Sequence, residues 1–330
     1  MTIQSRKDNH IAVCLNQDVQ SECLNGFEKY RLIHNALPEI DFENVKIDTV
    51  FLKKNISAPI LISSITGGTE SGNRINRSLV EAANTLNIPF AMGSMRILLE
   101  ENSIGTFENP RKLAPNIPVL ANIGAVQFNY GFSRDHCLQA IELIEADALI
   151  LHLNPLQEVL QSSKNTNFFG ILKKIEHLCS DFPVPVVVKE VGWGISADIA
   201  KKLFDSGVQI IDVAGAGGTS WAKVEKEIAG TVTAERLAAP FYNWGIPTAQ
   251  CIDQIHAQYP SIALIASGGI THGVDIWKAL LLGAQMAGMA GPLMTPANES
   301  PQAVVSFLEV IMNQLRIAKF LSQTIVKEYD

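Results

Sequence analysis

The sequence has little that would direct it to a nucleic acid, an anionic membrane or an oxidising compartment. Its 33 acidic residues outnumber its 26 basic ones, so the net charge of −7 provides no basic field to attract either polyanion. Its five cysteines are odd in number and scattered without a CxxC pair, which argues against both a disulfide framework and a zinc site. We therefore expect reduced thiols, a cytoplasmic protein, and a local cluster of cations wherever an anion binds.

Long apolar segments of the kind that enter membranes are also missing. The first ten residues, MTIQSRKDNH, lack the apolar core of a signal peptide. The longest uncharged stretch, residues 279–298, has four glycines or prolines between Gly283 and Pro292, which is more typical of a helix end followed by a strand. We expect no membrane association.

Eight short apolar runs recur along the chain. They occupy residues 59–65, 90–94, 118–124, 148–153, 185–191, 209–215, 263–270 and 286–291. Most lack polar alternation, as parallel strands covered on both faces do. Amphipathic segments lie between them, at residues 73–86, 136–144, 168–178, 197–205 and 251–257. This alternation predicts an α/β fold, a (β/α)8 TIM barrel formed as a single domain over residues 59–330.

Two regions fall outside this alternation of predicted strands and helices. Residues 1–58 form an N-terminal extension, in which we expect a helix near 26–35 and a strand or hairpin near 44–52. Residues 219–248 form a long loop after the sixth strand, which is either a lid, a binding loop or a subunit contact. The alternative fold is a doubly wound open sheet. It is disfavoured because polar residues follow nearly every strand instead of gathering at one switch point.

The most informative segment is His152-Leu-Asn-Pro-Leu-Gln-Glu158, which follows the apolar run 148–151 without a spacer. A barrel enzyme presents its chemical groups where strands end in this way. Glu158 is suited to hold Mg²⁺ together with substrate phosphates, because Mg²⁺ favours one or two carboxylates plus phosphate oxygens. The alternative is that Glu158 only complements the start of the next helix.

Glycine pairs follow several of the expected strands. Gly268-Gly269 and Ala290-Gly291 come after the seventh and eighth, where barrels frequently bind phosphate. Such residues let backbone N–H groups approach an anion closely. Together with Gly67-Gly68 and Gly217-Gly218, they indicate a phosphorylated cofactor rather than isolated tight turns.

Cations occur at two places where an anion is needed. Lys189 lies in an interior strand, so its ammonium requires Glu190, another barrel carboxylate or a bound ligand as partner. The alternative is a lysine at the tip of the strand whose ammonium extends to solvent. Arg6, Lys7 and His10 precede the fold. If the N-terminal segment folds over the mouth, they and Arg96 would suit a diphosphate. Otherwise they are basic residues of a solvated tail.

Taken together, several motifs closely resemble type 2 isopentenyl diphosphate isomerase, in order and over nearly the whole chain. They are RKDNH (6–10), SITGG (64–68), GSMR (93–96), HLNPLQE (152–158), KEVGWG (189–194), AGAGGTSW (214–221), SGGI (267–270) and AGPLM (290–294). The resemblance implies an isomerase that interconverts isopentenyl diphosphate and dimethylallyl diphosphate. It also implies FMN and Mg²⁺ as cofactors, NADPH as reductant of the flavin, and a homo-oligomer of four or more chains.

The resemblance also assigns roles to residues. FMN contacts are expected at Ser64, Ile65, Thr66, Gly67, Ser94, Asn122, Lys189, Thr219, Gly268, Gly269, Ala290 and Gly291. Substrate contacts are expected at Arg6, Lys7, His10, Ser94, Arg96, His152, Asn154 and Gln157, and Mg²⁺ at Glu158. Family members commonly carry Met where this chain has Ile65, and both are apolar.

Moving a double bond requires protonation at one carbon and deprotonation at another. On the resemblance, the hypothesis is that reduced flavin handles these protons through N5. The catalytic side chains are expected to be Gln157, Lys189 and His152. Lys189 would stabilise the anionic flavin and Gln157 would play a supporting role near the alkene.

Other functions remain as alternatives. A 2-hydroxy-acid oxidase would need a His and an Arg after the sixth and seventh strands, and an IMP dehydrogenase would need a Cys after the sixth. Residues 214–222 and 267–270 contain none of these. A flavin- or phosphate-binding barrel without catalysis is the alternative from a different class.

Overall fold

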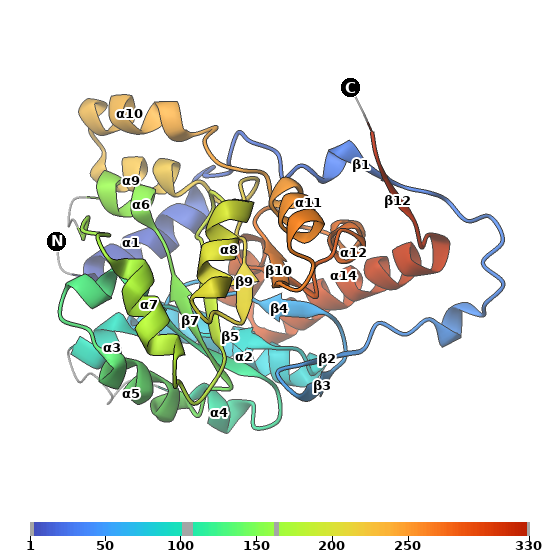
Figure 1. The fold of residues 1–330 in the computed structure, drawn as a ribbon, viewed down its shortest axis with the longest axis horizontal. Helices are drawn as coiled ribbons and strands as arrows, with labels where there is room; N and C mark the ends of the chain where they lie inside the picture. The colour runs from blue at the N-terminus through green and yellow to red at the C-terminus, as the bar shows by residue number, and fades with distance from the viewer. Residues whose placement is uncertain (1–2, 101–107, 162–164, 329–330) are drawn as a thin grey trace.

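The chain forms a closed barrel of eight parallel strands surrounded by helices, as the computed structural model shows (Figure 1). The model describes residues 3–100, 108–161 and 165–328. The barrel strands are β4 (Ile60–Ile62), β5 (Phe90–Ala91), β6 (Val119–Gly124), β7 (Ala148–His152), β8 (Val186–Lys189), β9 (Ile210–Asp212), β10 (Ala263–Ser267) and β11 (Met286–Met289). Each pairs with the next in the chain, and β11 closes onto β4. The (β/α)8 fold is confirmed, and the open sheet is excluded.

The barrel interior is a packed apolar core. A hairpin closes it at the end where the strands begin. Alternate strand residues, among them Leu61, Leu120, Ile150 and Val187, point inward. Strands β2 (Thr49–Phe51) and β3 (Lys54–Ile56) form an antiparallel hairpin, which adds Phe51 and Ile56 to the same cluster. The strand or hairpin expected near residues 44–52 is therefore present as a hairpin, shifted to residues 49–56. It plugs the end of the barrel opposite the strands' carboxyl termini.

Amphipathic helices cover the outside of the barrel (Figure 1). The longer ones are α2 (Glu70–Leu86), α5 (Arg134–Ile144), α7 (Ile171–Cys179), α8 (Ala197–Asp205), α11 (Thr248–Gln258), α12 (Gly273–Leu281) and α14 (Pro301–Leu321), and the short ones are α3 (Arg96–Glu100), α4 (Pro110–Leu113), α6 (Pro155–Leu160) and α13 (Met294–Glu299). In α2, for example, Thr69 caps the first turn through Gly72 N, and Ile75 and Leu79 are buried against the strands. Within the described residues, none of the helices has the length and apolar character needed to cross a bilayer.

The N-terminal segment differs from expectation. It begins with α1 (Ile3–Asn16), which the sequence did not indicate because the helix is mostly polar and lacks a strong apolar stripe. The prediction of a helix near residues 26–35 is wrong. Gly26 adopts a positive φ of 84°, a 3₁₀ turn follows at Phe27–Lys29, and β1 (Tyr30–Leu32) then pairs with β12 (Ile325–Lys327). Pairing with a distant strand outweighs the local helical preference of these residues.

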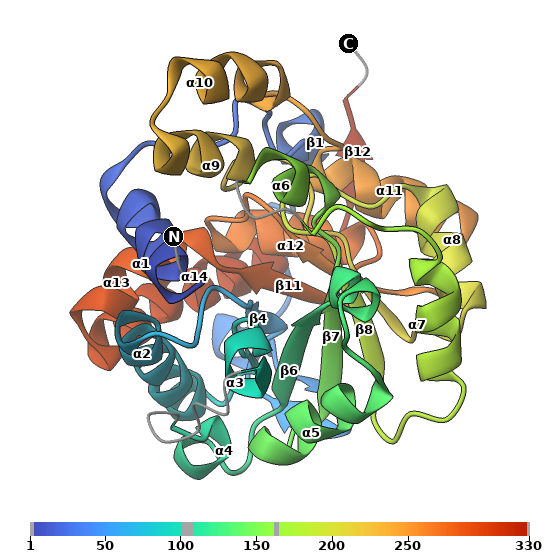
Figure 2. The ribbon, with the colours of Figure 1, turned by 90° about the vertical axis from the view of Figure 1, so that its left-hand side faces the viewer.

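Residues 219–248 are not a structureless loop either. They contain α9 (Trp221–Ala229) and α10 (Val232–Ala238), capped by Ser220 and Thr231 and separated by Gly230. Both caps and the glycine are ordinary helix boundary signals. Helix α9 contacts α1 and α6, so these three helices gather on one side of the molecule with α10 beyond them (Figures 1 and 2).

Candidate functional site at the barrel mouth

Because all eight strands are parallel, the segments singled out in the sequence share one rim of the barrel. The expected FMN contacts belong to seven of the strands: Ser64, Ile65, Thr66 and Gly67 follow β4, Ser94 follows β5, Asn122 lies in β6, Lys189 ends β8, Thr219 follows β9, Gly268 and Gly269 follow β10, and Ala290 and Gly291 follow β11. The remaining strand, β7, ends at His152 and leads into the segment 152–158. The fold thus brings these residues to one end of the barrel.

A row of paired residues crosses the mouth from β7 to β9. His152 lies beside Lys189, and Lys189 lies beside Asp212. The Lys189 ammonium is 3.3 Å from Asp212 Oδ2 and donates to Ser267 Oγ at 3.3 Å. Of the three partners considered for Lys189, the structure therefore identifies a barrel carboxylate. Sequence reasoning missed Asp212, although it is the only charged residue in the apolar run 209–215.

His152 is held as a neutral imidazole. Its Nδ1 lies 2.9 Å from Asn122 Oδ1, which can only accept, so Nδ1 carries the proton. Burial, followed by the positive charges of Lys189 and Lys7, lowers the pKa of His152 to about 4. An arriving anion would offset those charges and favour protonation. The residue therefore suits an anion site. Asn122, expected to contact FMN, also orients this imidazole.

The glycine loops after β9 and β10 pack backbone against backbone. Gly268 has a φ of +105°, and a Cβ there would lie 2.0 Å from Gly215 O. A Cβ on Gly269 would lie 2.4 Å from Gly217 O. After β11, a Cβ on Gly291 would approach Thr219 Oγ1 to 3.1 Å, so the third loop joins the same cluster. These glycines are required for loop packing as well as for the phosphate approach that the sequence suggested.

Several polar atoms at the mouth suit a flat polar cofactor such as FMN. Within the described residues, Ser63 Oγ, Ser64 Oγ, Gln127 Oε1 and Asn154 Oδ1 are buried without a hydrogen-bond partner. Buried polar groups normally have partners, so such a concentration is characteristic of a site that pairs with a ligand. Lys189 also has three N–H donors but only two protein partners. The residue types present therefore fit FMN.

The segment after β7 turns into α6 and buries its polar side chains. Asn154 Nδ2 donates to Gln157 Oε1 at 3.2 Å and to Glu158 Oε1 at 3.1 Å. Glu158 Oε2 accepts from Asn165 N at 3.1 Å. Burial raises the pKa of Glu158, against the lowering effects of these bonds and of the charges on Arg6 and Arg96.

Glu158 also lies in the first turn of α6, so the helix-start alternative remains compatible with its position. A cation beside its carboxylate would offset the burial that raises its pKa. No group of three or more His, Cys, Asp or Glu able to hold a metal occurs among residues 3–100, 108–161 and 165–328. A cation here would consequently take most of its ligands from substrate phosphates and water, which is the coordination that Mg²⁺ prefers.

Helix α1 lies over the mouth and is joined to α6 and α9 through one carboxylate. Glu225 on α9 is only 4% exposed. Its Oε1 accepts from Arg6 at 2.9 Å and from Gln157 Nε2 at 3.1 Å, and lies 3.0 Å from His10 Nε2. Burial favours the neutral acid, but the hydrogen bond and charge of His10 and the charge of Arg6 outweigh it and lower the pKa of Glu225. Sequence reasoning missed Glu225.

The two remaining cations of the expected clamp are Lys7 on α1 and Arg96 at the start of α3. Lys7 Nζ donates to Gly67 O at 2.5 Å and to Ser94 O at 3.0 Å. Arg96 pairs with Glu100 at 2.8 Å on α3. The alternative of a solvated basic tail is therefore wrong, since Lys7 bonds to the loops after β4 and β5 while Arg6 and His10 bond to Glu225 on α9.

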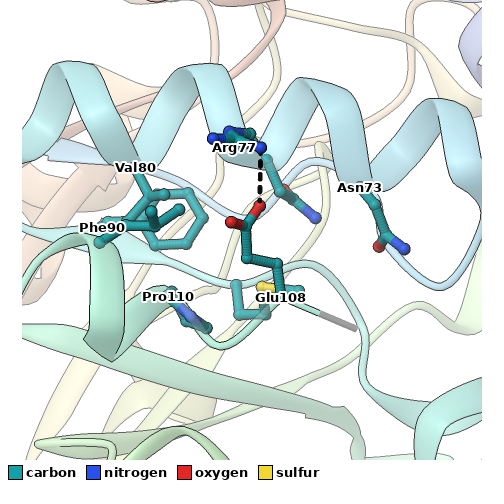
Figure 3. Close-up of a pocket in the computed structure, with 9 residues that line it drawn as sticks. Asn73, Arg77, Val80, Phe90, Glu108 and Pro110 are labelled. Carbon is teal, nitrogen blue, oxygen red and sulfur yellow. Dashed lines mark ion pairs between the residues drawn. The ribbon is translucent and has the colours of Figure 1, made fainter. Parts of the chain in front are cut away.

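A small cavity beneath α2 is not part of this site. Its volume is about 10 Å³, enough for about one water molecule. Figure 3 shows Arg77 and Glu108 forming an ion pair across it. Asn76 also lines it, and the Asn76 amide donates to Thr66 O at 2.8 Å. The cavity thus lies behind the loop after β4 rather than at the mouth.

The chain is similar to known flavin and isomerase families. Residues 152–321 match the model of the FMN-dependent dehydrogenase family. An isopentenyl-diphosphate delta-isomerase of Nostoc sp. is 48% identical over 318 residues, which is 96% of this chain and 91% of that protein. One of Pseudescherichia vulneris is 47% identical, with the same coverage of each chain.

Solved structures share the architecture at much lower identity. A soluble mutant of the (S)-mandelate dehydrogenase of Pseudomonas putida has a TM-score of 0.67 at 15% identity, covering 99% of this chain and 100% of that one. At this identity the likeness shows the fold alone.

Proposed function

Because the chain belongs to the isopentenyl-diphosphate delta-isomerase family and has an FMN-dependent dehydrogenase domain, we propose that its reaction takes place at the barrel mouth, with reduced FMN and Mg²⁺. One observation carries the assignment of the site. The cations Arg6, Lys7 and Lys189 reach one rim together with Gln157, and a neutral His152 lies among them. This arrangement suits a small anion attached to an uncharged, reactive hydrocarbon.

The diphosphate would be bound by side chains from two layers. Arg6, Lys7 and His10 would approach it from α1, and Arg96 and His152 from the rim. A diphosphate offers several oxygens to Arg and Lys, whose charge-assisted hydrogen bonds are roughly twice as strong as neutral ones. His152 would take up a proton as the anion arrives, because the anion offsets the charges that keep its pKa low. Glu158 would hold Mg²⁺ against the same phosphate oxygens.

Gln157 would orient the hydrocarbon end of the substrate. Its amide is fixed on both sides, by Asn154 at Oε1 and by Glu225 at Nε2. An amide is a poor acid, so its role is to position rather than to transfer a proton. When bound and reduced, FMN supplies the acid–base group that moves the allylic proton. Lys189, held by Asp212, would place a positive charge beside the negative charge of the reduced ring.

NADPH as the source of reducing equivalents and a homo-oligomer of four or more chains belong to the same proposal. Both follow from the family resemblance rather than from any contact in the chain.

The test begins with the purified protein and its visible flavin spectrum. The protein is then incubated anaerobically with NADPH, Mg²⁺ and isopentenyl diphosphate, and the appearance of dimethylallyl diphosphate is followed by NMR. We expect yellow protein, conversion that requires both NADPH and Mg²⁺, and reduced turnover with retained flavin in Gln157→Asn. A colourless protein that gains no activity with added FMN would contradict the proposal, and unchanged activity in Gln157→Asn would remove that residue from the mechanism.

A further inference from the structure

A second and much larger cavity lies outside the barrel, behind the ends of β7 and β8. Its volume is about 570 Å³, within the range of about 300–1,000 Å³ that small-molecule sites occupy. Neighbouring residues of a strand face opposite sides. His152 and Lys189 therefore face the mouth, whereas the residues that follow them, Leu153 and Glu190, line this cavity. It is thus separate from the proposed diphosphate and flavin sites.

The walls of the cavity are mainly apolar and include two indole rings. Trp193 is buried at 7% exposure, while Trp244 and Ile199 stand at the opening with 58% and 42% exposure. Leu156 on α6 also lines the cavity and packs in the same apolar cluster as Trp193. Exposed apolar side chains that gather around one cavity, rather than scattering singly, are characteristic of a binding site.

The only charged group that lines the cavity, within the described residues, is the carboxylate of Glu190. It is 6% exposed, and its Oε2 accepts the backbone N–H groups of Val191, Gly192 and Trp193 at 2.7, 2.7 and 2.6 Å. No hydrogen bond to Oε1 occurs in the described part of the chain. The three N–H bonds fix the carboxyl group rigidly, so the second oxygen is held at one place in the cavity.

Charge and shape together define what this cavity accepts. Burial raises the pKa of Glu190 to about 7, against the lowering effects of the three N–H bonds and of the Lys189 charge. A cation bound beside this group would offset the burial and favour the carboxylate form. Among the described residues no Lys, Arg or His lines the cavity to compete with such a cation. Indole faces bind ammonium groups through their π-electrons, with stabilisation that grows when water is excluded. The apolar walls favour a hydrocarbon body over a second polar group. An anionic ligand would meet repulsion from Glu190 and no compensating charge.

We propose that this cavity is a second binding site, which takes a small organic ammonium with an apolar chain. The ammonium donates to Glu190 Oε1, and the chain lies against Leu156, Trp193 and Trp244. The inference stands independently of the isomerase reaction, because it requires only the folded protein.

The experiment is isothermal titration of the flavin-loaded protein with octylammonium, octanol and octanoate, with tryptophan fluorescence as a second readout. We expect one octylammonium per chain, and octanoate at least tenfold weaker. Glu190→Gln keeps an oxygen for the three N–H groups but removes the charge, so it should weaken octylammonium at least tenfold and leave octanol unchanged. The matched control is Glu142→Gln, the same change at an exposed position on α5, which should leave all three ligands unaffected.

A second variant keeps the test decisive if Glu190→Gln fails to fold. Ile199→Trp adds bulk at the rim of the cavity and should abolish binding of octylammonium and octanol. Val310→Trp, at a position on α14 that is 56% exposed and does not line the cavity, is its control. Octanoate binding as tightly as octylammonium, no saturable binding at all, or full binding in Ile199→Trp would overturn the proposal. None of these outcomes bears on turnover of the diphosphate substrate.

Discussion

Replacing Glu225 by alanine tests how α1 is held over the barrel mouth. The substitution removes a carboxylate that is 4% exposed and leaves Arg6, His10 and the Gln157 amide without their shared acceptor. Breaking a buried ion pair by deleting one partner costs about 3–5 kcal/mol. Helix α1 has 14 residues and little apolar patterning, and isolated helices of that length are marginal in water. Whether α1 stays helical should therefore depend on its contacts with the rest of the protein.

The expected loss of about 3 kcal/mol corresponds to roughly a 100-fold increase in local opening. Hydrogen exchange measured by mass spectrometry should show that increase in peptides from residues 3–16, with the barrel strands unchanged. The KM for isopentenyl diphosphate should rise while bound FMN is retained. Glu227→Ala is the control, because Glu227 lies two residues further along and forms only a partly exposed pair with Lys226, worth about 0–1 kcal/mol. Unchanged exchange of residues 3–16 in Glu225→Ala would refute the reasoning.

Three further predictions concern the rim itself. Gly93→Ala should weaken FMN binding at least tenfold by fluorescence titration, because the new Cβ would lie 1.8 Å from Thr66 O and displace the loop after β4. Gly131→Ala is its control for a strained substitution away from the rim, because the φ of Gly131 is +92° but a Cβ there would have nothing within 4 Å. Equal FMN affinity in both variants would show that the loop tolerates the shift. Asp212→Ala should destabilise the protein to urea by about 3–5 kcal/mol, because it leaves the Lys189 ammonium buried without its counter-charge; a loss below about 1 kcal/mol would mean that Lys189 finds another partner. His152 is neutral in the folded protein down to about pH 4 but protonates near pH 6.5 when unfolded, so stability should fall as the pH drops through that window. Between pH 7 and pH 5 the ligand-free protein should lose about 2 kcal/mol more than His152→Gln, and parallel losses in the two proteins would place the titration elsewhere.

The parts of the structure that could be predicted from sequence are those fixed by local pattern. Each barrel strand is an apolar run bounded by polar residues, and a closed parallel barrel then forces the strand ends onto one rim. That is why the sequence alone could place Lys189 and His152 at the barrel mouth. Asp212 was missed because it lies inside such a run, where a charge is normally excluded.

The parts that could not be predicted are held by long-range polar contacts. Helix α1 contacts α9 through a bond between Arg6 and Glu225, which are 219 positions apart. No pattern in the sequence of either helix predicts that the two helices are in contact. Helix α9 also lies in the connection 219–248, which was predicted to be a loop because of its length. Such a pairing depends on the completed barrel, which brings α6 and α9 side by side.

The mouth therefore has two halves that are stabilised in different ways. Lys189, Asp212 and His152 are placed by strand register, which the whole barrel core maintains and which a single surface substitution does not move. The cations of α1 are placed by side-chain bonds that converge on Glu225 and, through it, on Gln157. Loss of the second set leaves the first intact, so the proposed flavin contacts and His152 can stay in place while the α1 side of the proposed diphosphate site comes apart. Retention of FMN in a variant is for that reason no evidence that the proposed diphosphate site is assembled.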